Sequence, residues 1–211
     1  RWDSQGIVNN GFVFTLGGCS YGLPPQDCTT MNRVVQTFQL YNNYSGSPKS
    51  YTTGANLFAT DRIGASSVVL NGYIYVAGGC TSATDCTDAT SNTQYAAINA
   101  DGSLGSWSNT TDATLPADRA WGQLEAAGGT LYYIGGQDDT STNEQSTVSY
   151  GTPGAGGDIS SWATATNGLP AARTKHGATV WNDRLYVVGG LDSTASETTT
   201  VYYSPDLSSG G

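Results

Sequence analysis

The sequence has little charge, and few of its charged residues are basic. Charged residues make up 12 % of the 211 residues, about half the share found in ordinary soluble proteins. Lysine and arginine number 8 against 17 aspartates and glutamates, so the net charge is −9 and the pI is near 4.2. Duplex nucleic acid and anionic membrane surfaces bind clustered basic residues. Because the sequence has no such cluster, we expect neither as a partner.

Long hydrophobic runs are also lacking. No apolar run approaches the ~20 residues needed to span a bilayer, so we expect no membrane insertion. No signal peptide is visible, and the chain begins with Arg1 rather than Met, which indicates a processed form or a piece of a longer chain. Glycine (28 residues), tyrosine (13) and many Ser, Thr and Asn take the place of charge. Gly and Thr disfavour helices, so this composition favours short strands joined by polar turns.

Four repeats are found when the sequence is compared with itself. A Gly-Gly pair ends four runs of aromatic and β-branched residues, at 12–18, 73–79, 130–136 and 184–190. The first glycines of these pairs are Gly17, Gly78, Gly135 and Gly189. An arginine lies 16 positions before each of them: Arg1, Arg62, Arg119 and Arg173. Between arginine and Gly-Gly lies a turn pair: Asn10-Gly11, Asn71-Gly72, Gly128-Gly129 and Asn182-Asp183. Such pairs are typical of two-residue type I′ hairpins, whose central residues both have positive φ.

Each repeat is predicted to contain four strands. The first follows the arginine, the second ends at Gly-Gly, and the third includes residues 37–41 in the first repeat and 199–203 in the last. The fourth is expected to carry Trp107 or Trp162, with Tyr51 in the same place in the first repeat. A repeated four-stranded meander of ~50 residues predicts the blades of a β-propeller. The predicted blades are 1–61, 62–118, 119–172 and an incomplete 173–211.

The order of arginine, hairpin, aromatic-x-Gly-Gly, tyrosine-bearing strand and late tryptophan resembles the kelch repeat, over nearly the whole chain. The resemblance implies an all-β, kelch-type propeller segment of about four four-stranded antiparallel blades, the last incomplete. Kelch propellers usually close with six or seven blades. The resemblance therefore implies that further blades are missing here, or that neighbouring chains cover the open blade edges.

Most repeat residues are expected to have structural roles. The strand-two aromatics Phe14, Tyr75, Tyr132 and Tyr186 pack the blades, and Trp107 and Trp162 fill the spaces between them. The Gly-Gly pairs let one blade's backbone approach the next. Arg62, Arg119 and Arg173 are expected to donate hydrogen bonds to loop carbonyls or carboxylates near the axis, in preference to binding a ligand.

All four cysteines lie in the first two repeats, after Gly-Gly. The simplest pairing is local, Cys19–Cys28 and Cys80–Cys86, but Cys19–Cys80 with Cys28–Cys86 across neighbouring blades stays open. A zinc site is a weaker alternative, because there is no Cys-x-x-Cys pair. Disulfides predict an oxidising compartment, and hence a secreted or cell-surface protein.

No catalytic constellation is found, so we expect no enzyme activity in this chain. His176 is the one histidine, whereas galactose-oxidase-like kelch enzymes hold copper with two histidines and two tyrosines. A Ser-His-Asp triad would also need His176, which the repeat register places in strand one as a variable residue. The three repeat arginines suggest a sialidase-like arginine triad, but the repeat itself already accounts for them.

The long loops between strands two and three form one face of the predicted propeller, and we expect recognition to occur there. The candidate binding residues on this loop face are Tyr21, Asp27, Asp85, Asp138, Asp139 and Asp192. Calcium is the one cofactor that such acidic loops suggest. Their spacing matches no calcium-binding loop, which favours solvated acidic loops instead.

The leading functional hypothesis is a non-catalytic extracellular module for protein interaction, adhesion or self-assembly through open blade edges. A carbohydrate-binding domain is the alternative, since Trp121 and Trp181 lie in strand one, outside the repeat's tryptophan position, and could stack on sugar rings. The third hypothesis is a fragment of a secreted kelch enzyme whose active site lies in missing blades.

Overall fold

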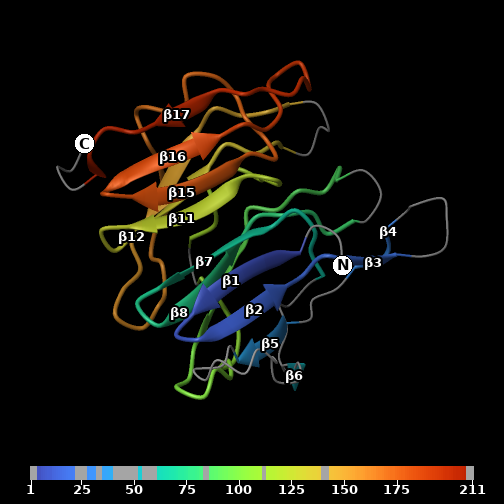
Figure 1. Ribbon diagram of the computed structural model, residues 1–211, viewed down its shortest axis with the longest axis vertical. Helices are drawn as coiled ribbons and strands as arrows, with labels where there is room; N and C mark the ends of the chain where they lie inside the picture. The colour runs from blue at the N-terminus through green and yellow to red at the C-terminus, as the bar shows by residue number, and fades with distance from the viewer. Residues whose placement is uncertain are drawn as a thin grey trace, which may run out of the picture.

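The computed structural model describes residues 4–21, 28–31, 35–39, 52–53, 61–82, 86–110, 113–138 and 143–207. These residues form β-strands and contain no α-helix. The strands make four antiparallel sheets that follow one another in chain order, with blade 1 at the bottom of Figure 1 and blade 4 at the top. The chain thus has the all-β blade architecture that the repeats predict.

Three sheets are four-stranded meanders and the last has three strands in the described residues. Blade 1 contains β1 (Gln5–Asn9), β2 (Phe12–Leu16), β5 (Val35–Gln39) and β6 (Thr52–Thr53). Blade 2 contains β7 (Ser66–Leu70), β8 (Tyr73–Ala77), β9 (Thr93–Ala97) and β10 (Ser108–Asn109). Blade 3 contains β11 (Gln123–Ala127), β12 (Thr130–Ile134), β13 (Val148–Gly151) and β14 (Ala163–Thr164). Blade 4 contains β15 (Gly177–Trp181), β16 (Arg184–Val188) and β17 (Val201–Tyr203).

The four predicted hairpin turns are confirmed. Each joins the first two strands of a blade, and both of its central residues have positive φ, for example 51° at Asn71 and 80° at Gly72. This is the backbone that a type I′ turn requires, and Asn and Gly adopt it at the lowest cost.

The outer strands differ in detail from the sequence prediction. Strand three of blade 1 begins earlier than expected, because Val35 pairs with Leu16 at the Gly-Gly end of β2; Leu40 and Tyr41 lie outside the described residues. Trp107 and Trp162 precede the short strands β10 and β14 and are not part of them. A further two-stranded ribbon, β3 (Cys19–Tyr21) with β4 (Cys28–Met31), occupies the loop between β2 and β5.

The core is built from side chains that point alternately to the two faces of the sheet along the second strand of each blade. In β8, Ile74 and Val76 face blade 1, while Tyr75 and Ala77 face blade 3. Trp107 packs into the interface between blades 1 and 2, and Trp162 into that between blades 2 and 3. Blades 2 and 3 are therefore each held between two apolar layers, one on either face of the sheet.

The Gly-Gly pair is a point where the backbones of neighbouring blades approach closely. The N–H of the second glycine donates to the carbonyl of the next blade's repeat arginine: Gly18 to Arg62 (3.0 Å), Gly79 to Arg119 (2.8 Å) and Gly136 to Arg173 (2.8 Å). The first glycine leaves room for the same carbonyl. A Cβ at Gly135 would lie 2.5 Å from the Arg173 oxygen, whereas one at Gly189, which has no described blade beyond it, would lie 3.4 Å from its nearest neighbour.

One charged side chain lies in the interface between blades 3 and 4. β11 packs against β7 and β15. Leu124 and Ala126 face blade 2, so the alternate residue Glu125 points to the other side of the strand. Burial raises the pKa of the Glu125 carboxyl to about 7. Its ionised form is therefore destabilising at this interface.

Gly135 and Gly189, the first glycines of the Gly-Gly pairs in blades 3 and 4, give a matched pair of variants. Both have positive φ, 58° at Gly135 and 66° at Gly189. Gly189→Ala should lower the free energy of unfolding by about 1–2 kcal/mol, because alanine is disfavoured in the left-handed backbone conformation. Gly135→Ala should cost at least about 2 kcal/mol more, because its methyl group also clashes with the Arg173 carbonyl. Urea denaturation measures both, and equal losses would contradict the close-approach interpretation.

Glu125 should make stability fall as the pH rises. Its pKa is higher in the folded chain than in the unfolded one, so its protonated form favours folding below about pH 4.5 and this contribution is lost as the pH rises through 7. Glu125→Gln should be about 1 kcal/mol more stable than the wild type at pH 8, after solvent screening of the carboxylate is allowed for. The two proteins should have equal stability near pH 4. Urea midpoints across this range test the difference, and parallel pH profiles would refute it.

Candidate functional site

The described acidic residues of the loop face mainly hold their own loops in shape. Asp192 Oδ1 accepts hydrogen bonds from the backbone N–H groups of Thr194 (2.9 Å) and Ser196 (3.2 Å) and from the Thr194 hydroxyl (2.7 Å). The Thr194 bonds are the main reason that the Asp192 pKa is lowered. Asp138 Oδ2 accepts from the side-chain amides of Asn143 and Gln145. These are the local bonds of polar turns.

The other candidates of this face receive no side-chain description. Asp27, Asp85 and Asp139 lie outside the described residues, and Tyr21 is placed only through its backbone in β3. Within the described part of the chain, no group of three or more His, Cys, Asp or Glu side chains could hold a metal ion. The same residues include no helix with the length and apolar character of a membrane span.

A disulfide bond closes the loop of blade 2. Cys80 and Cys86 are bonded, with Cα atoms 5.2 Å apart, and both are buried beside Ile63 and Ala120. The alternative pairing across blades is therefore wrong, and neither of these cysteines is available as a zinc ligand. Cys19 is also in a disulfide; the side chain of its predicted partner, Cys28, lies outside the described part of the structure.

The repeat arginines bond mainly to the outer strands and loops of their own blades. Arg62 donates from Nη1 to the carbonyls of Gly78 and Asn92 (3.1 Å each) and from Nη2 to the Asn92 side chain. Burial lowers the pKa of this guanidinium to about 10. Arg173 donates to Thr200 Oγ1 (2.7 Å) and to the Tyr202 hydroxyl (2.9 Å), and its guanidinium carbon lies 5.0 Å from the Tyr202 ring centroid. These hydrogen bonds connect the start of the first strand to the loops and outer strands of the same blade.

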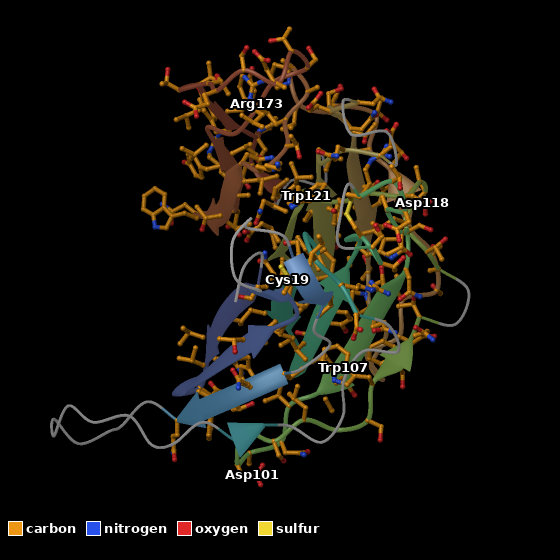
Figure 2. The ribbon with its side chains drawn as sticks, turned by 90° about the vertical axis from the view of Figure 1, so that its right-hand side faces the viewer. Cys19, Asp101, Trp107, Asp118, Trp121 and Arg173 are labelled. Atoms are coloured by element: carbon orange, nitrogen blue, oxygen red, sulfur yellow. A yellow bond between two sulfur atoms is a disulfide. The ribbon has the colours of Figure 1, made fainter. Side chains whose placement is uncertain are left out.

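A ladder of backbone hydrogen bonds links blades 2, 3 and 4, two residues after the repeat arginines Arg62, Arg119 and Arg173. Trp121 N–H donates to the Gly64 carbonyl (2.8 Å), and Lys175 N–H donates to the Trp121 carbonyl (2.9 Å). All three residues have positive φ, 60° at Gly64, 50° at Trp121 and 53° at Lys175. Trp121 lies between Arg173 and Cys19 along the molecule in Figure 2. Two non-glycine residues in this conformation indicate strain that the surrounding packing maintains.

Side chains stack along this ladder. The Trp121 indole lies so close to Gly64 that a Cβ there would be 2.7 Å from Nε1. The Lys175 ammonium lies 4.9 Å from the centroid of the Trp121 ring, a cation–π distance. Trp121 is therefore clamped between a glycine of blade 2 and a lysine of blade 4.

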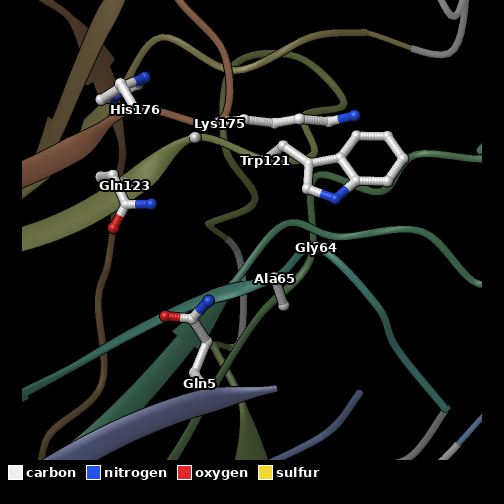
Figure 3. Close-up of a pocket in the computed structure, with 8 residues that line it drawn as sticks. Gln5, Gly64, Ala65, Trp121, Gln123, Lys175 and His176 are labelled. Atoms are coloured by element: carbon white, nitrogen blue, oxygen red, sulfur yellow. The ribbon is translucent and has the colours of Figure 1, made fainter. Parts of the chain in front are cut away.

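Beside this stack is a cavity of about 400 Å³, which we call the axial cavity (Figure 3). Its lining comes from the residues two to four positions after the repeat arginines, at the start of each first strand: Gln5, Gly64, Ala65, Trp121, Gly122, Gln123, Lys175 and His176. Gln5 pairs with Leu16 and Gln123 with Ile134, next to the Gly-Gly pairs. The axial cavity thus lies at the end of the blades from which the long loops emerge.

His176 is the buried polar residue of the axial cavity. Its side chain is 3 % exposed, and neither ring nitrogen has a hydrogen-bond partner. Burial, together with the nearby positive charge of Arg173, lowers the pKa of the imidazole to about 4. The ring is therefore neutral near pH 7.

The loop face predicted from the sequence and the axial cavity lie at the same end of the blades, but the sequence analysis did not single out the residues of the cavity. It treated His176 as a variable strand residue and did not consider Gln5, Gln123 or Lys175. A signal was available: Gln5 and Gln123 both follow their repeat arginine by four positions. Residues that share a repeat position meet at the axis when blades pack side by side.

His176 should make the protein less stable in acid. Its pKa is lower in the folded chain than in the unfolded one, so its contribution is present above pH 6.5 and is lost as the pH falls through 4. The free energy of unfolding of the wild type should therefore fall by about 2–3 kcal/mol more between pH 7 and 4 than that of His176→Ala. Alanine is the residue at the same repeat position in blade 2, Ala65. Urea titrations at the two pH values measure the difference, which would be absent if the folded imidazole titrated normally.

Comparisons with known proteins agree with this architecture. Residues 61–91 and 172–207 match the kelch motif. The solved structure of YjhT, a kelch-type propeller, matches with a TM-score of 0.68 at 14 % sequence identity, over 96 % of this chain and 68 % of that one. No curated protein matches the sequence. The chain therefore contains kelch motifs and has the fold of a kelch-type β-propeller.

Proposed function

We propose that the chain is a non-catalytic protein-interaction module, and that it binds its partner through the outward face of blade 4. This face consists of Trp181, Tyr186, Val188, Val201 and Tyr203, on the side of β15–β17 turned away from blade 3. The kelch-type fold supports an interaction role in general. The following observations support this face in particular.

The exposure of the blade 4 face is the observation that carries the proposal. Val188 is 49 % exposed, whereas Ile134 and Ala77, at the same repeat position in blades 3 and 2, are fully buried against the next blade. Tyr203 is 69 % and Trp181 65 % exposed. A contiguous apolar surface of this kind is typical of a protein-binding site.

The open strand edge supports the same site. β17 pairs with β16 on one side, and no described strand lies on its other side. In blades 1–3 this position is filled by β6, β10 and β14. A partner that covers the blade 4 face can therefore bury side chains on the sheet and satisfy backbone groups at its edge.

A second copy of this chain is the partner whose chemistry fits. In the described part of blade 1, Val8 is exposed on β1, and Val13 lies at the β2 position that faces the preceding blade elsewhere. Packing blade 1 of one copy on blade 4 of another would repeat the contact that already joins blades within the chain. Because two different faces meet, this contact is head-to-tail, and repeating it makes rings or fibres.

We further propose that the module works outside the cytosol, in adhesion or assembly. The buried Cys80–Cys86 bond supports an oxidising compartment. The low share of charged residues leaves a Ser-, Thr- and Asn-rich surface, and such a surface suits contacts built on shape and hydrogen bonds rather than on charge.

Self-association should depend on the blade 4 face. The wild-type chain should show a sedimentation coefficient that rises with protein concentration. Tyr203→Asp places a charge on the contact face and should weaken self-association more than about tenfold. Ser160→Asp makes the same change in charge at an exposed site of blade 3 and should leave it unaltered.

Sedimentation velocity over a wide range of concentrations checks these three outcomes. A wild-type chain that stays monomeric throughout would overturn a second copy as the partner. Equal weakening by Ser160→Asp would show that general charge repulsion causes the effect, and would overturn the assignment of the face.

A further inference from the structure

The interface between blades 3 and 4 differs from the two interfaces before it. Trp107 packs between blades 1 and 2, and Trp162 between blades 2 and 3. The residues described between blades 3 and 4 include no tryptophan, and Trp181, the last tryptophan of the sequence, is exposed on the blade 4 face. This interface instead contains a cavity of about 290 Å³, which we call the outer cavity. It is lined mainly by apolar side chains of both blades, among them Tyr132, Val148, Leu169, Leu185, Val187 and Tyr202.

The strand register places the outer cavity where a tryptophan lies in the preceding blade. In blade 3, Trp162 covers Gly151, because a Cβ at Gly151 would be 3.0 Å from the Cδ2 atom of the indole. Gly151 pairs with Leu131. The blade 4 residue at this position is Ser204, whose N–H donates to the Leu185 carbonyl (2.9 Å) and which lines the outer cavity. Leu131 and Leu185 each precede their Gly-Gly pair by four positions, so the outer cavity takes the place of the indole.

Blade 2 shows the same relation between a small residue and a tryptophan. Ala96 pairs with Ile74 and belongs to the cluster against which Trp107 packs. Blades 2, 3 and 4 therefore have Ala, Gly and Ser at this position. A small residue leaves room for a large ring above it, and blade 4 keeps that small residue.

We propose that the outer cavity binds the indole of a tryptophan carried by an extended segment of a partner protein, which pairs with β17 as a fourth strand. This inference rests on the proposed protein-interaction role, but the outer cavity lies on the side of β15–β17 that faces blade 3, opposite the blade 4 face.

The pairing in blade 3 shows how one segment can make both contacts. The residues directly after Trp162 form β14, where Ala163 pairs with Tyr150 and Thr164 with Ser149 of β13. In blade 4, β17 lies near the top of the molecule in Figure 1 and has a described neighbour only on its β16 side. A segment that pairs with the free edge of β17 can therefore insert its tryptophan into the outer cavity.

The chemistry of the outer cavity defines the segment further. The indole N–H of Trp162 has no hydrogen-bond partner in its own interface, so shape and apolar burial are what such a site recognises. The lining of the outer cavity, with Tyr132, Leu185 and Tyr202, offers both. Asp206 is the one charged residue of this lining, and the chain has a net charge of −9. These charges disfavour an acidic segment, so the partner's segment is neutral or basic.

A peptide copied from blade 2 provides the probe. Residues Gly102–Asn109, capped at both ends, contain Trp107 and the short strand β10 and carry no charge. In NMR titrations at millimolar concentration, this peptide should shift the methyl resonances of Leu185 and Val187 in a saturable manner. The Trp107→Ala peptide should bind at least about tenfold more weakly.

Three results of these titrations would contradict the proposal. No shift at Leu185 and Val187 with the tryptophan peptide, or equal binding of the two peptides, would overturn the site. Equally tight binding of N-acetyltryptophanamide would overturn the assignment of a strand, since pairing with β17 would then contribute nothing.

Two alanines of blade 3 give matched variants of the protein. Ala165 lines the outer cavity, whereas Ala163 is exposed on β14 and does not line it. Ala165→Phe places a ring in the outer cavity and should weaken binding of the tryptophan peptide at least about tenfold. Ala163→Phe should leave binding unaltered, and equal effects of the two variants would refute the site.

Peptide binding and sedimentation together separate this proposal from the previous one. A chain that binds the peptide but stays monomeric would support the outer cavity and overturn a second copy as the partner at the blade 4 face. A chain that self-associates but does not bind the peptide would overturn the outer cavity alone.

Discussion

The contact on which the rest of this structure depends is the approach of one blade's Gly-Gly pair to the backbone of the next repeat arginine. At this point the backbone segments of two neighbouring blades meet without any intervening side chain, and the N–H of Gly79 or Gly136 donates to the arginine carbonyl at 2.8 Å. A Cβ on the first glycine would overlap that oxygen. The distance between inner strands is therefore fixed by backbone atoms, and side-chain packing farther out must conform to it.

The fixed inner contact gives each blade two different apolar faces. Along β8, alternate residues join the cluster with blade 1 or the cluster with blade 3. The same pattern continues into blade 4, where Leu185 and Val187 are buried but Val188 and Tyr203 are exposed. The proposed interaction site is thus the ordinary next-blade face of the repeat, met where no described blade covers it.

The backbone ladder of Gly64, Trp121 and Lys175 likewise fixes the positions of neighbouring blades near the axis. Backbone hydrogen bonds hold these residues in a left-handed conformation, which stacks their side chains on one another. The residues that follow them, Gln123 and His176, then line a common cavity.

The repeats and the hairpin turns followed from the sequence by itself, because each depends on residues close together in the chain. The sequence made the local disulfide of blade 2 the simplest pairing but left the pairing across blades open, and the structure decided between them. Asn71-Gly72 determines its own turn, and Cys80 reaches Cys86 across a short loop. The structural role of the arginines could also be predicted, since the register repeats.

The axial cavity and the exposed face of blade 4 were decided only by the tertiary structure. Gln5, Gln123 and His176 are far apart in the sequence and line one cavity because the first strands of neighbouring blades pack side by side. Asp138 and Asp192 looked like binding residues in the sequence, yet folding directs their oxygens to their own loops. Sequence determines which groups a repeat contains, but only the packing of blades decides which groups face one another and which are left without a partner.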